Sequence, residues 1–367
     1  MKAVKADYAL LREELDVEED LCFHLDEDGS LASIEKGGSC SADTIRVPLI
    51  LPKPSNAHIH SSDVLWPDVG FEMSIEELVS PPRGLKHVLL SRAGERAASD
   101  ASLGVYKWLD SMGVGGVGDF KEPASGGCLP TRERLENTAV RLEVVLLGRP
   151  GDPYGLEGCD GIGLNSPLDV DPTRIRGLKN SLKGPLHAHV AEIPELRREG
   201  DLEAALEMGV DAIVHGTHLK SGDLDLLRDN GVIHVMSVRS NMWHSTGIPP
   251  VAEAINRGVR IAVGTDNAAW NTPDVWEEAY SLALVGRLQG LKDERLARAI
   301  LEGLFVWGYR SLYREPSRVV EGVDGCRLLA VFLAEEELGL LKRSYNKYYA
   351  VLRVVRPSKT RSLCDIL

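Results

Sequence analysis

Histidines and carboxylates follow several apolar runs of this sequence, at positions where strands are expected to end. His58 and His60 are one residue apart, and alternate side chains of a strand share a face, so both can bind one metal ion. Later runs of the same kind are followed by His187, His189, Glu192, His215, His218, Asp266 and Asn267. Three imidazoles and a carboxylate suit Zn²⁺ or Fe²⁺ and leave room for water. The pattern predicts a hydrolytic metal site.

The chemistry of such a site requires acid–base groups beside the metal. A bound metal lowers the pKa of water from about 16 toward ~7 and so generates hydroxide at neutral pH. One carboxylate can accept that proton, and a second acid can deliver it to a leaving nitrogen. Glu192, three residues after His189, is the candidate for the second step. Taken singly, His187 also fits a hydrogen-bonded core histidine, Glu192 a helix start and Asp266 an N-cap.

Eight strand-like runs alternate with helix-like segments and would position these residues. Strands are expected near 47–59, 114–120, 142–148, 159–165, 184–191, 211–217, 232–238 and 259–265. Helices are expected at about 92–111, 131–140, 172–181, 195–208, 221–230, 249–257 and across 274–313. This alternation predicts an α/β protein, a (β/α)8 TIM-type barrel whose strand ends meet at one face. An open doubly wound sheet is the competing fold, but no Gly-x-Gly-x-x-Gly turn opens the first helix.

The two ends of the chain do not follow this alternation. Residues 21–35 read as a β-hairpin that turns at Asp28-Gly29. The stretches 326–333 and 348–355 also read as strands. We therefore predict a small β-sandwich from residues 1–46 and 320–367, flanking a barrel domain of residues 47–319.

The bulk composition excludes several classes of protein. A net charge of −13 argues against a nucleic-acid-binding surface, which needs clustered Lys and Arg. No apolar stretch approaches the ~20 residues of a membrane span, and the N-terminus lacks the pattern of a signal peptide. We expect a cytoplasmic protein with no nucleic-acid or membrane partner. The six cysteines are scattered, so free and mostly buried thiols are expected rather than disulfides.

The ordered series of motifs resembles the amidohydrolase superfamily, in its branch of aminohydrolases of the chlorohydrolase and deaminase type. The resemblance runs from about residue 47 to 310, in order and with natural spacing. Its motifs are Pro54-Ser-Asn-Ala-His-Ile-His60, His187-Ala-His-Val-Ala-Glu192, His215-Gly-Thr-His-Leu219, Arg239-Ser-Asn241 and Gly264-Thr-Asp266. The chain departs from the family at Ser237-Val238, where the family has Cys-Pro, and at Trp270, where many deaminases keep a small polar residue.

The resemblance implies a role for each matching position. The metal ligands would be His58, His60, His189 and Asp266, with His189 rather than His187 as the third ligand. Asp266 would also be the general base, Glu192 the acid, and His215 would polarise the reacting centre or contact the metal. His218 would brace its loop. The expected fourth strand ends in Gly163-Leu-Asn-Ser-Pro167, without the Lys or Glu that bridges two metals in some members, which favours one divalent metal. Zinc is the first expectation and iron the second.

The substrate pocket is expected to be lined by polar and aromatic residues that follow the same strands. We predict substrate contacts from Asn241, Trp270, His244 and Trp66. For Trp270, and for Trp243, which is also expected at the pocket, packing at the barrel rim is the alternative. Such a lining suits a planar, hydrogen-bonding small molecule, a heterocycle.

Three functions compete on this site. We expect hydrolysis of a non-peptide carbon–nitrogen bond, and within that class the deamination of a heterocyclic amine by metal-activated hydroxide. The alternative is ring opening of a cyclic amide of the imidazolone or hydantoin type. A metal-binding barrel without catalysis is the third. The sequence does not fix the oligomeric state, and a homodimer is among the expectations.

Overall fold

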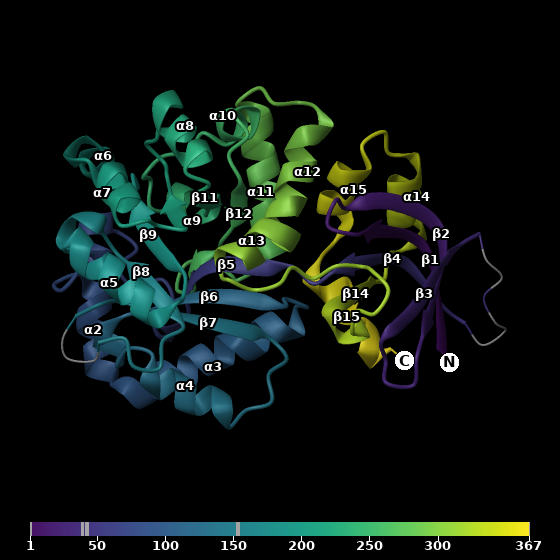
Figure 1. Ribbon diagram of the computed structural model, residues 1–367, viewed down its shortest axis with the longest axis horizontal. Helices are drawn as coiled ribbons and strands as arrows, with labels where there is room; N and C mark the ends of the chain where they lie inside the picture. Colours follow the sequence, from purple (N-terminus) through teal and green to yellow (C-terminus); the bar gives the residue numbers. More distant parts are fainter. Residues whose placement is uncertain (1, 38–39, 41–43, 152–154, 367) are drawn as a thin grey trace.

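The computed structural model describes residues 2–37, 40, 44–151 and 155–366, and its larger part is a barrel of parallel strands (Figure 1). The barrel strands are β5 (Ser55–His60), β6 (Gly116–Lys121), β7 (Glu143–Gly148), β8 (Gly161–Leu164), β9 (Leu186–Val190), β10 (Ala212–His215), β11 (Ile233–Met236), β12 (Ile261–Val263) and β13 (Asp266–Asn267). Neighbours in this order pair in parallel from β5 to β12. The chain then passes from β12 into β13, which pairs with β5 through Asp266 opposite Ile59 and closes the barrel. The predicted TIM-type barrel is confirmed.

Helices surround the barrel. They are α1 (Ile75–Val79), α2 (Leu85–Ala93), α3 (Glu95–Ser111), α4 (Leu129–Glu136), α5 (Pro172–Leu182), α6 (Pro194–Glu199), α7 (Asp201–Glu207), α8 (Ser221–Asp229), α9 (Val238–Trp243), α10 (Val251–Asn256), α11 (Val275–Leu288), α12 (Glu294–Glu302) and α13 (Gly308–Ser311). Short 3-10 helices η1 (Ser61–Leu65) and η3 (Pro167–Asp169) follow β5 and β8, and a π-helical turn η4 (Gly303–Trp307) joins α12 to α13. Helices α1 and α9, among others, contribute residues to a cavity or a polar cluster at the mouth of the barrel. Apolar residues of the helices and strands form one large cluster, and a second, smaller cluster, mainly of strand residues, includes Phe120, Val145 and Val235.

A separate six-stranded sheet lies beside the barrel, built from both ends of the chain (Figure 1). Its strands are β1 (Lys2–Leu11), β2 (Asp16–Leu25), β3 (Leu31–Lys36), β4 (Ile45–Pro52), β14 (Leu328–Val331) and β15 (Thr360–Ser362). The order is β15-β14-β4-β1-β2-β3, with its own apolar cluster around Val4, Phe23 and Leu328. The predicted hairpin is present, since Gly29 N–H donates to the carbonyl of Asp26 between β2 and β3.

The expected first barrel strand, 47–59, is divided between the two sheets. Its first part is β4, which pairs with β1 and β14, and only β5 enters the barrel. Pro52 and Pro54 account for the break, because neither carries the N–H that a continuous strand needs. The domain boundaries at 46/47 and 319/320 remain a proposal.

The stretch 348–355 is a helix, so the predicted strand there is wrong. Helix α15 (Lys347–Val354) follows α14 (Glu335–Arg343), and Asn346 caps its first turn by accepting the N–H of Tyr349. The cap and the burial of Ala350, Val351 and Val354 outweigh the strand preference of the β-branched residues.

The expectation of free thiols is also wrong. The structure joins Cys22 to Cys40, Cys128 to Cys159 and Cys326 to Cys364, with Cα atoms 4.9 to 5.8 Å apart. Partners are 18 to 38 residues apart in sequence, and only the folded chain brings them together. The predicted cytoplasmic location is untested. In the described part of the chain, every helix is too short or too polar to cross a membrane.

Candidate metal and catalytic site

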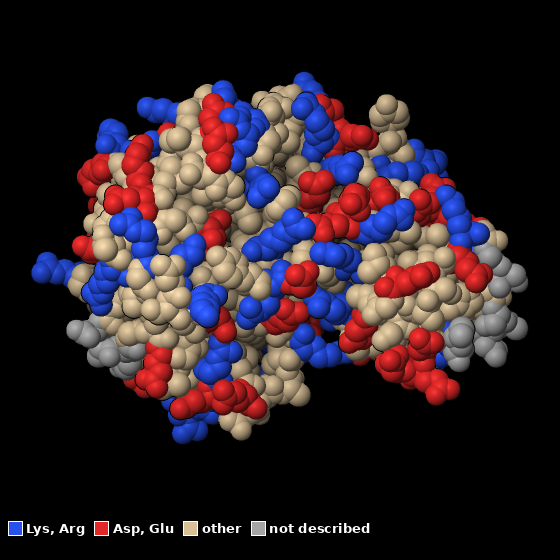
Figure 2. All heavy atoms as spheres, viewed as in Figure 1, with Lys and Arg blue, Asp and Glu red and all other residues tan. Residues whose placement is uncertain are grey.

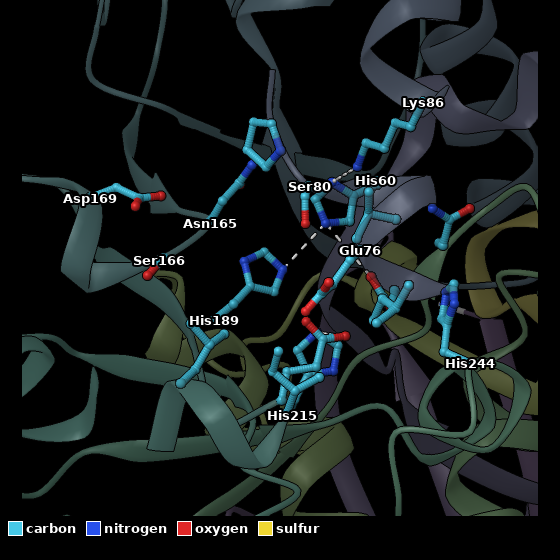
Figure 3. Close-up of a pocket in the computed structure, with 18 of the residues that line it drawn as sticks. His60, Glu76, Ser80, Lys86, Asn165, Ser166, Asp169, His189, His215 and His244 are labelled. Atoms are coloured by element: carbon cyan, nitrogen blue, oxygen red, sulfur yellow. Dashed lines mark hydrogen bonds and ion pairs between the residues drawn. The ribbon is translucent and has the colours of Figure 1, made fainter. Parts of the chain in front are cut away.

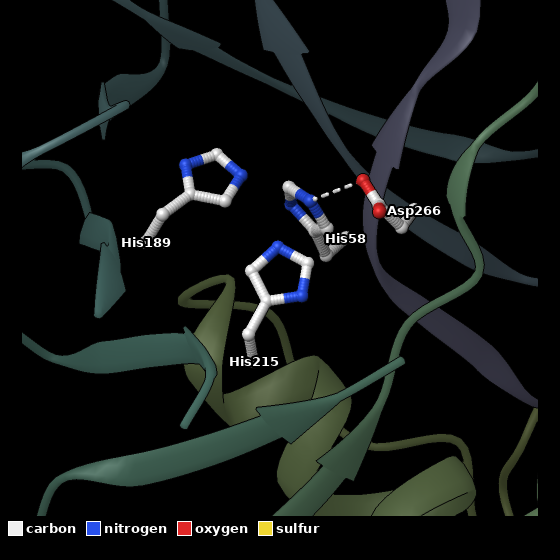
Figure 4. Close-up of side chains that lie close together, drawn as sticks. All are labelled: His58, His189, His215 and Asp266. Atoms are coloured by element: carbon white, nitrogen blue, oxygen red, sulfur yellow. Dashed lines mark hydrogen bonds and ion pairs between the residues drawn. The ribbon is translucent and has the colours of Figure 1, made fainter. Parts of the chain in front are cut away.

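Four side chains from four strand ends meet inside the barrel mouth (Figure 4). His58 is on β5, His189 on β9 and His215 on β10, and Asp266 opens β13. Each offers one ligand atom, and these atoms all lie within 4.8 Å of one another. All four residues are buried. His60 borders the group, with its Nε2 3.4 Å from Nε2 of His189 and 3.7 Å from Oδ1 of Asp266. The predicted ligands are thus brought together, and His215 joins them.

The backbone at the cluster is built for close approach. A Cβ added to Gly264, between β12 and β13, would lie 2.8 Å from Cβ of His58, so only glycine fits there. His215 and Asp266 have φ angles of 70° and 57°, in the left-handed region that costs most residues free energy. Strained backbone of this kind is typical of residues whose side chains must be aimed at a site.

Hydrogen bonds fix how the cluster presents its atoms. His189 Nδ1 donates to the carbonyl of Leu164 at 3.0 Å, which leaves the lone pair of Nε2 facing the cluster. Asp266 Oδ1 lies 3.1 Å from His58 Nε2, and Oδ2 accepts from the hydroxyl of Ser240. The donor set fits a divalent metal, because borderline ions such as zinc prefer neutral imidazoles and a carboxylate.

Burial and neighbouring groups set the charges of these residues. Burial lowers the pKa of His60 and His189 well below the usual histidine value, so both are neutral, as metal ligands must be. Burial opposes the ionisation of Asp266, but the hydrogen bond from His58 and the nearby imidazoles outweigh it and hold its pKa well below normal. Asp266 is therefore a carboxylate at neutral pH, available as ligand or base.

Glu192 lies in the loop after β9, on the cavity side of the cluster. Its Oε1 is 3.5 Å from Nε2 of His215. Burial, together with the nearby charge of Asp266, raises the pKa of Glu192 to about 8. Glu192 is thus protonated at neutral pH. Two carboxyl groups of one site, one ionised and one protonated, can act as base and acid.

Asn241 and His234 position His215 from behind. The Asn241 amide donates to Nδ1 of His215 at 3.1 Å, which places the His215 proton on Nε2, toward Glu192. His234 Nε2 lies 2.8 Å from the carbonyl of His215 and supports the strained backbone there. The predicted substrate contact Asn241 therefore lies beneath the site and does not line the cavity.

A buried ionic network beside His60 was not predicted from the sequence. Lys86 of α2 has its Nζ 3.1 Å from Nδ1 of His60, 3.0 Å from Asp63 and 3.4 Å from Glu122. Burial opposes the charge of Lys86, but the two carboxylates raise its pKa above normal. Because Lys86 donates to Nδ1, neutral His60 carries its proton on Nε2. For Nε2 of His60 to bind a metal, the proton would have to sit on Nδ1 instead. Nδ1–H could then donate to Oε1 of Glu122, which is 3.8 Å away.

One of the two main residues of this network could have been recognised from the sequence. Glu122 directly follows β6, so it is a strand-end carboxylate like Asp266 and could have been recognised by the same rule. Lys86 lies within a helix and belongs to no motif, so its place in the site is visible only in the fold.

A cavity of about 460 Å³ opens over the cluster (Figure 3). His244 lines it, as predicted for a substrate contact. Trp66 and Trp270 instead line a separate space of about 20 Å³, and the Trp270 ring stacks on Trp243 at 4.8 Å between centroids. Both tryptophans thus pack at the rim in this structure.

The remaining two histidines of the motifs have structural partners. His187 Nε2 donates to the carbonyl of Ser311 at 2.7 Å, within the barrel core. His218 Nε2 donates to the carbonyl of Thr246 at 2.7 Å and braces that loop. These contacts agree with the choice of His189 over His187.

Comparisons with known proteins agree with the fold and the cluster. Residues 183–301 match the model of the amidohydrolase family. A putative aminohydrolase of Methanothermobacter thermautotrophicus is 27% identical over 279 residues, which cover 69% of this chain and 72% of that protein. A 5-methylthioadenosine/S-adenosylhomocysteine deaminase of Halobacterium salinarum is 33% identical over 153 residues, 38% of this chain and 36% of that protein. A zinc-bound adenosine deaminase structure from Xanthomonas campestris superimposes with a TM-score of 0.76 at 17% identity, covering 98% of this chain and 90% of that one.

The barrel, its strand-end cluster and the matched family model define a hydrolase of carbon–nitrogen bonds other than peptide bonds. The chain is similar to the amidohydrolase superfamily, in its aminohydrolase branch.

Proposed function

We propose that this protein deaminates a heterocyclic amine, using one zinc ion held by His58, His60, His189 and Asp266. The observation that carries the proposal is the presence of ionised Asp266 in the buried cluster and of protonated Glu192 beside it, 3.5 Å from His215, both lining the same cavity. Deamination needs both a base for water and an acid for the leaving nitrogen. The named relatives, a methylthioadenosine deaminase and an adenosine deaminase, support the same class of substrate.

Each residue of the site has a separate role in the proposed reaction. A zinc ion held by these residues would make a water nucleophile acidic near neutral pH. Asp266 Oδ1 or Oδ2 accepts that proton, because Asp266 is ionised and buried. Glu192 donates its proton to the ring nitrogen or the leaving amine. His215, with its proton on Nε2, donates a hydrogen bond to the reacting centre. His244 lines the cavity and would contact the ring.

A screen for ammonia release tests the proposed reaction. Purified protein would be incubated with aminopurines, aminopyrimidines, aminotriazines and cyclic ureas, with ammonia and ring opening followed separately. Release of ammonia from at least one amine is the expected result. Ring opening of a cyclic amide without ammonia release would favour the alternative reaction over deamination. If no compound is turned over, the remaining function is that of a metal-binding barrel without catalysis.

We expect about one zinc or iron ion per purified chain, measured by elemental analysis. His189→Asn should lower the metal content several-fold, because the variant removes the imidazole whose Nε2 faces the cluster. His187→Asn is the matched control, two residues earlier on the same strand, and should keep the metal because His187 bonds to Ser311. Two ions per chain would contradict the single-metal proposal, and equal loss in both variants would contradict the assignment of His189.

A further inference from the structure

Apolar side chains form the walls of the cavity above the cluster. Ile75 and Val79 come from α1, and Ile193 and Leu196 come from the segment around α6. Walls of this kind hold a planar ring by contact and desolvation. They do not distinguish ring systems that carry different charged substituents, so charge selection depends on the polar residues of the lining.

The lining offers almost no positive charge to a substrate. Among the described residues that line this cavity, Lys86 is the one ammonium or guanidinium group. Its three N–H bonds face His60, Asp63 and Glu122 at 3.0 to 3.4 Å. An ammonium has three donors and no acceptor, so none is left for a phosphate or carboxylate.

The mouth of the cavity carries three carboxylates: Glu76 on α1, Asp169 on η3 and Glu199 on α6. All three residues are exposed. Figure 3 shows Glu76 projecting over the cavity and Asp169 at its edge. In the described part of the chain Glu76 and Glu199 have no ion-pair partner, and Asp169 has only Arg149, 3.9 Å away. Like charges at the mouth of a low-dielectric cleft raise the free energy of an entering anion.

We infer that the substrate enters as a neutral or positively charged heterocycle, and that the rim of Glu76, Asp169 and Glu199 rejects analogues carrying a phosphate or carboxylate. This inference rests on the proposed function, because it assumes that the reaction takes place at the cluster beneath this cavity. It adds the substrate class, which is the free base or nucleoside and not the nucleotide.

The first test compares a nucleoside with its phosphate. Adenosine should be deaminated with a kcat/KM at least tenfold above that of adenosine 5′-monophosphate at low ionic strength. Added salt should narrow the ratio, because it screens exposed charges. The double variant Glu76→Gln/Glu199→Gln should raise the rate on the monophosphate several-fold and leave adenosine little changed. Glu195→Gln is the control, since Glu195 lies on α6 but does not line the cavity. The inference would be overturned by equal kcat/KM values for the two compounds, or by a ratio of the two values that is the same in the double variant as in the wild type.

A second test does not depend on turnover. Metal would be removed from the zinc-loaded protein by dipicolinate, a dianion, and by 1,10-phenanthroline, which is neutral. The double variant should lose zinc several-fold faster to dipicolinate and at an unchanged rate to phenanthroline. A similar change with both chelators, or with neither, would refute charge selection by the rim. If no nucleoside releases ammonia, the proposed function fails for that class, and the chelator rates alone decide the inference.

Discussion

Replacing Asp266 with Asn should lower kcat by about 10³–10⁴-fold, the range expected when a general base that also binds the metal is lost. Asn has nearly the shape of Asp, and its amide oxygen can still accept from His58, so the fold should persist. What the variant lacks is the negative charge that accepts the proton of water. Ammonia release, metal content and far-UV circular dichroism would be measured on the same preparation.

Asp63→Asn is the matched control for Asp266→Asn. Asp63 is also buried near the site, but it bonds to Lys86 and Asn267 and does not belong to the metal cluster. Because Asp63 is not part of the metal cluster, we expect this variant to keep activity within about tenfold of the wild type. A tenfold loss corresponds to ~1.4 kcal/mol of transition-state free energy. Activity retained in Asp266→Asn, or an equal loss in both variants, would refute the role of Asp266 as base.

The barrel and its cluster could be predicted because both depend on local pattern. Each barrel strand is a short apolar run between helical segments, and residues such as His189 and Asp266 follow those runs directly. In a parallel barrel the carboxyl ends of all strands share one face, so sequence order alone brings such residues together. The prediction needed no knowledge of how any two side chains contact each other.

Features that depend on contacts between distant segments were missed or wrong. Lys86 lies on a helix, 26 residues after His60, and only packing turns its ammonium toward that ring. The segment Lys347–Val354 is a helix although its β-branched residues favour a strand, because Asn346 caps the first turn and one face is buried. Trp66 and Trp270 follow strand ends too, yet they pack into a side space rather than the cavity. Position after a strand therefore predicts proximity to the site but not the direction of the side chain.

Replacing Glu192 with Gln should lower activity and raise stability together at pH 8. The loss of the acid should reduce kcat by about 10²–10⁴-fold. Wild-type activity should fall as pH rises past about 8, where Glu192 loses its proton. A bound cation would lower the pKa of Glu192, so this decrease in activity would then begin at a lower pH. The residual activity of the variant should not show this alkaline decrease, since glutamine does not titrate.

The stability effect has the opposite sign for a physical reason. In the unfolded chain a glutamate loses its proton near pH 4.5, whereas folded Glu192 keeps it to about pH 8. Between these values the folded state binds more protons, so wild-type stability falls as pH rises through this window. The cost reaches on the order of 5 kcal/mol above pH 8, and a bound cation would reduce it.

Thermal unfolding at pH 5 and pH 8 would measure this difference, with Glu195→Gln, on the exposed face of the same loop and helix, as the control. Glu192→Gln should unfold at a higher temperature than the wild type at pH 8, and the gap should narrow toward pH 5. A variant that loses both activity and stability would show that Glu192 supports the fold. Lower activity with higher stability is the signature of a carboxyl kept in an unfavourable place because the reaction requires its proton.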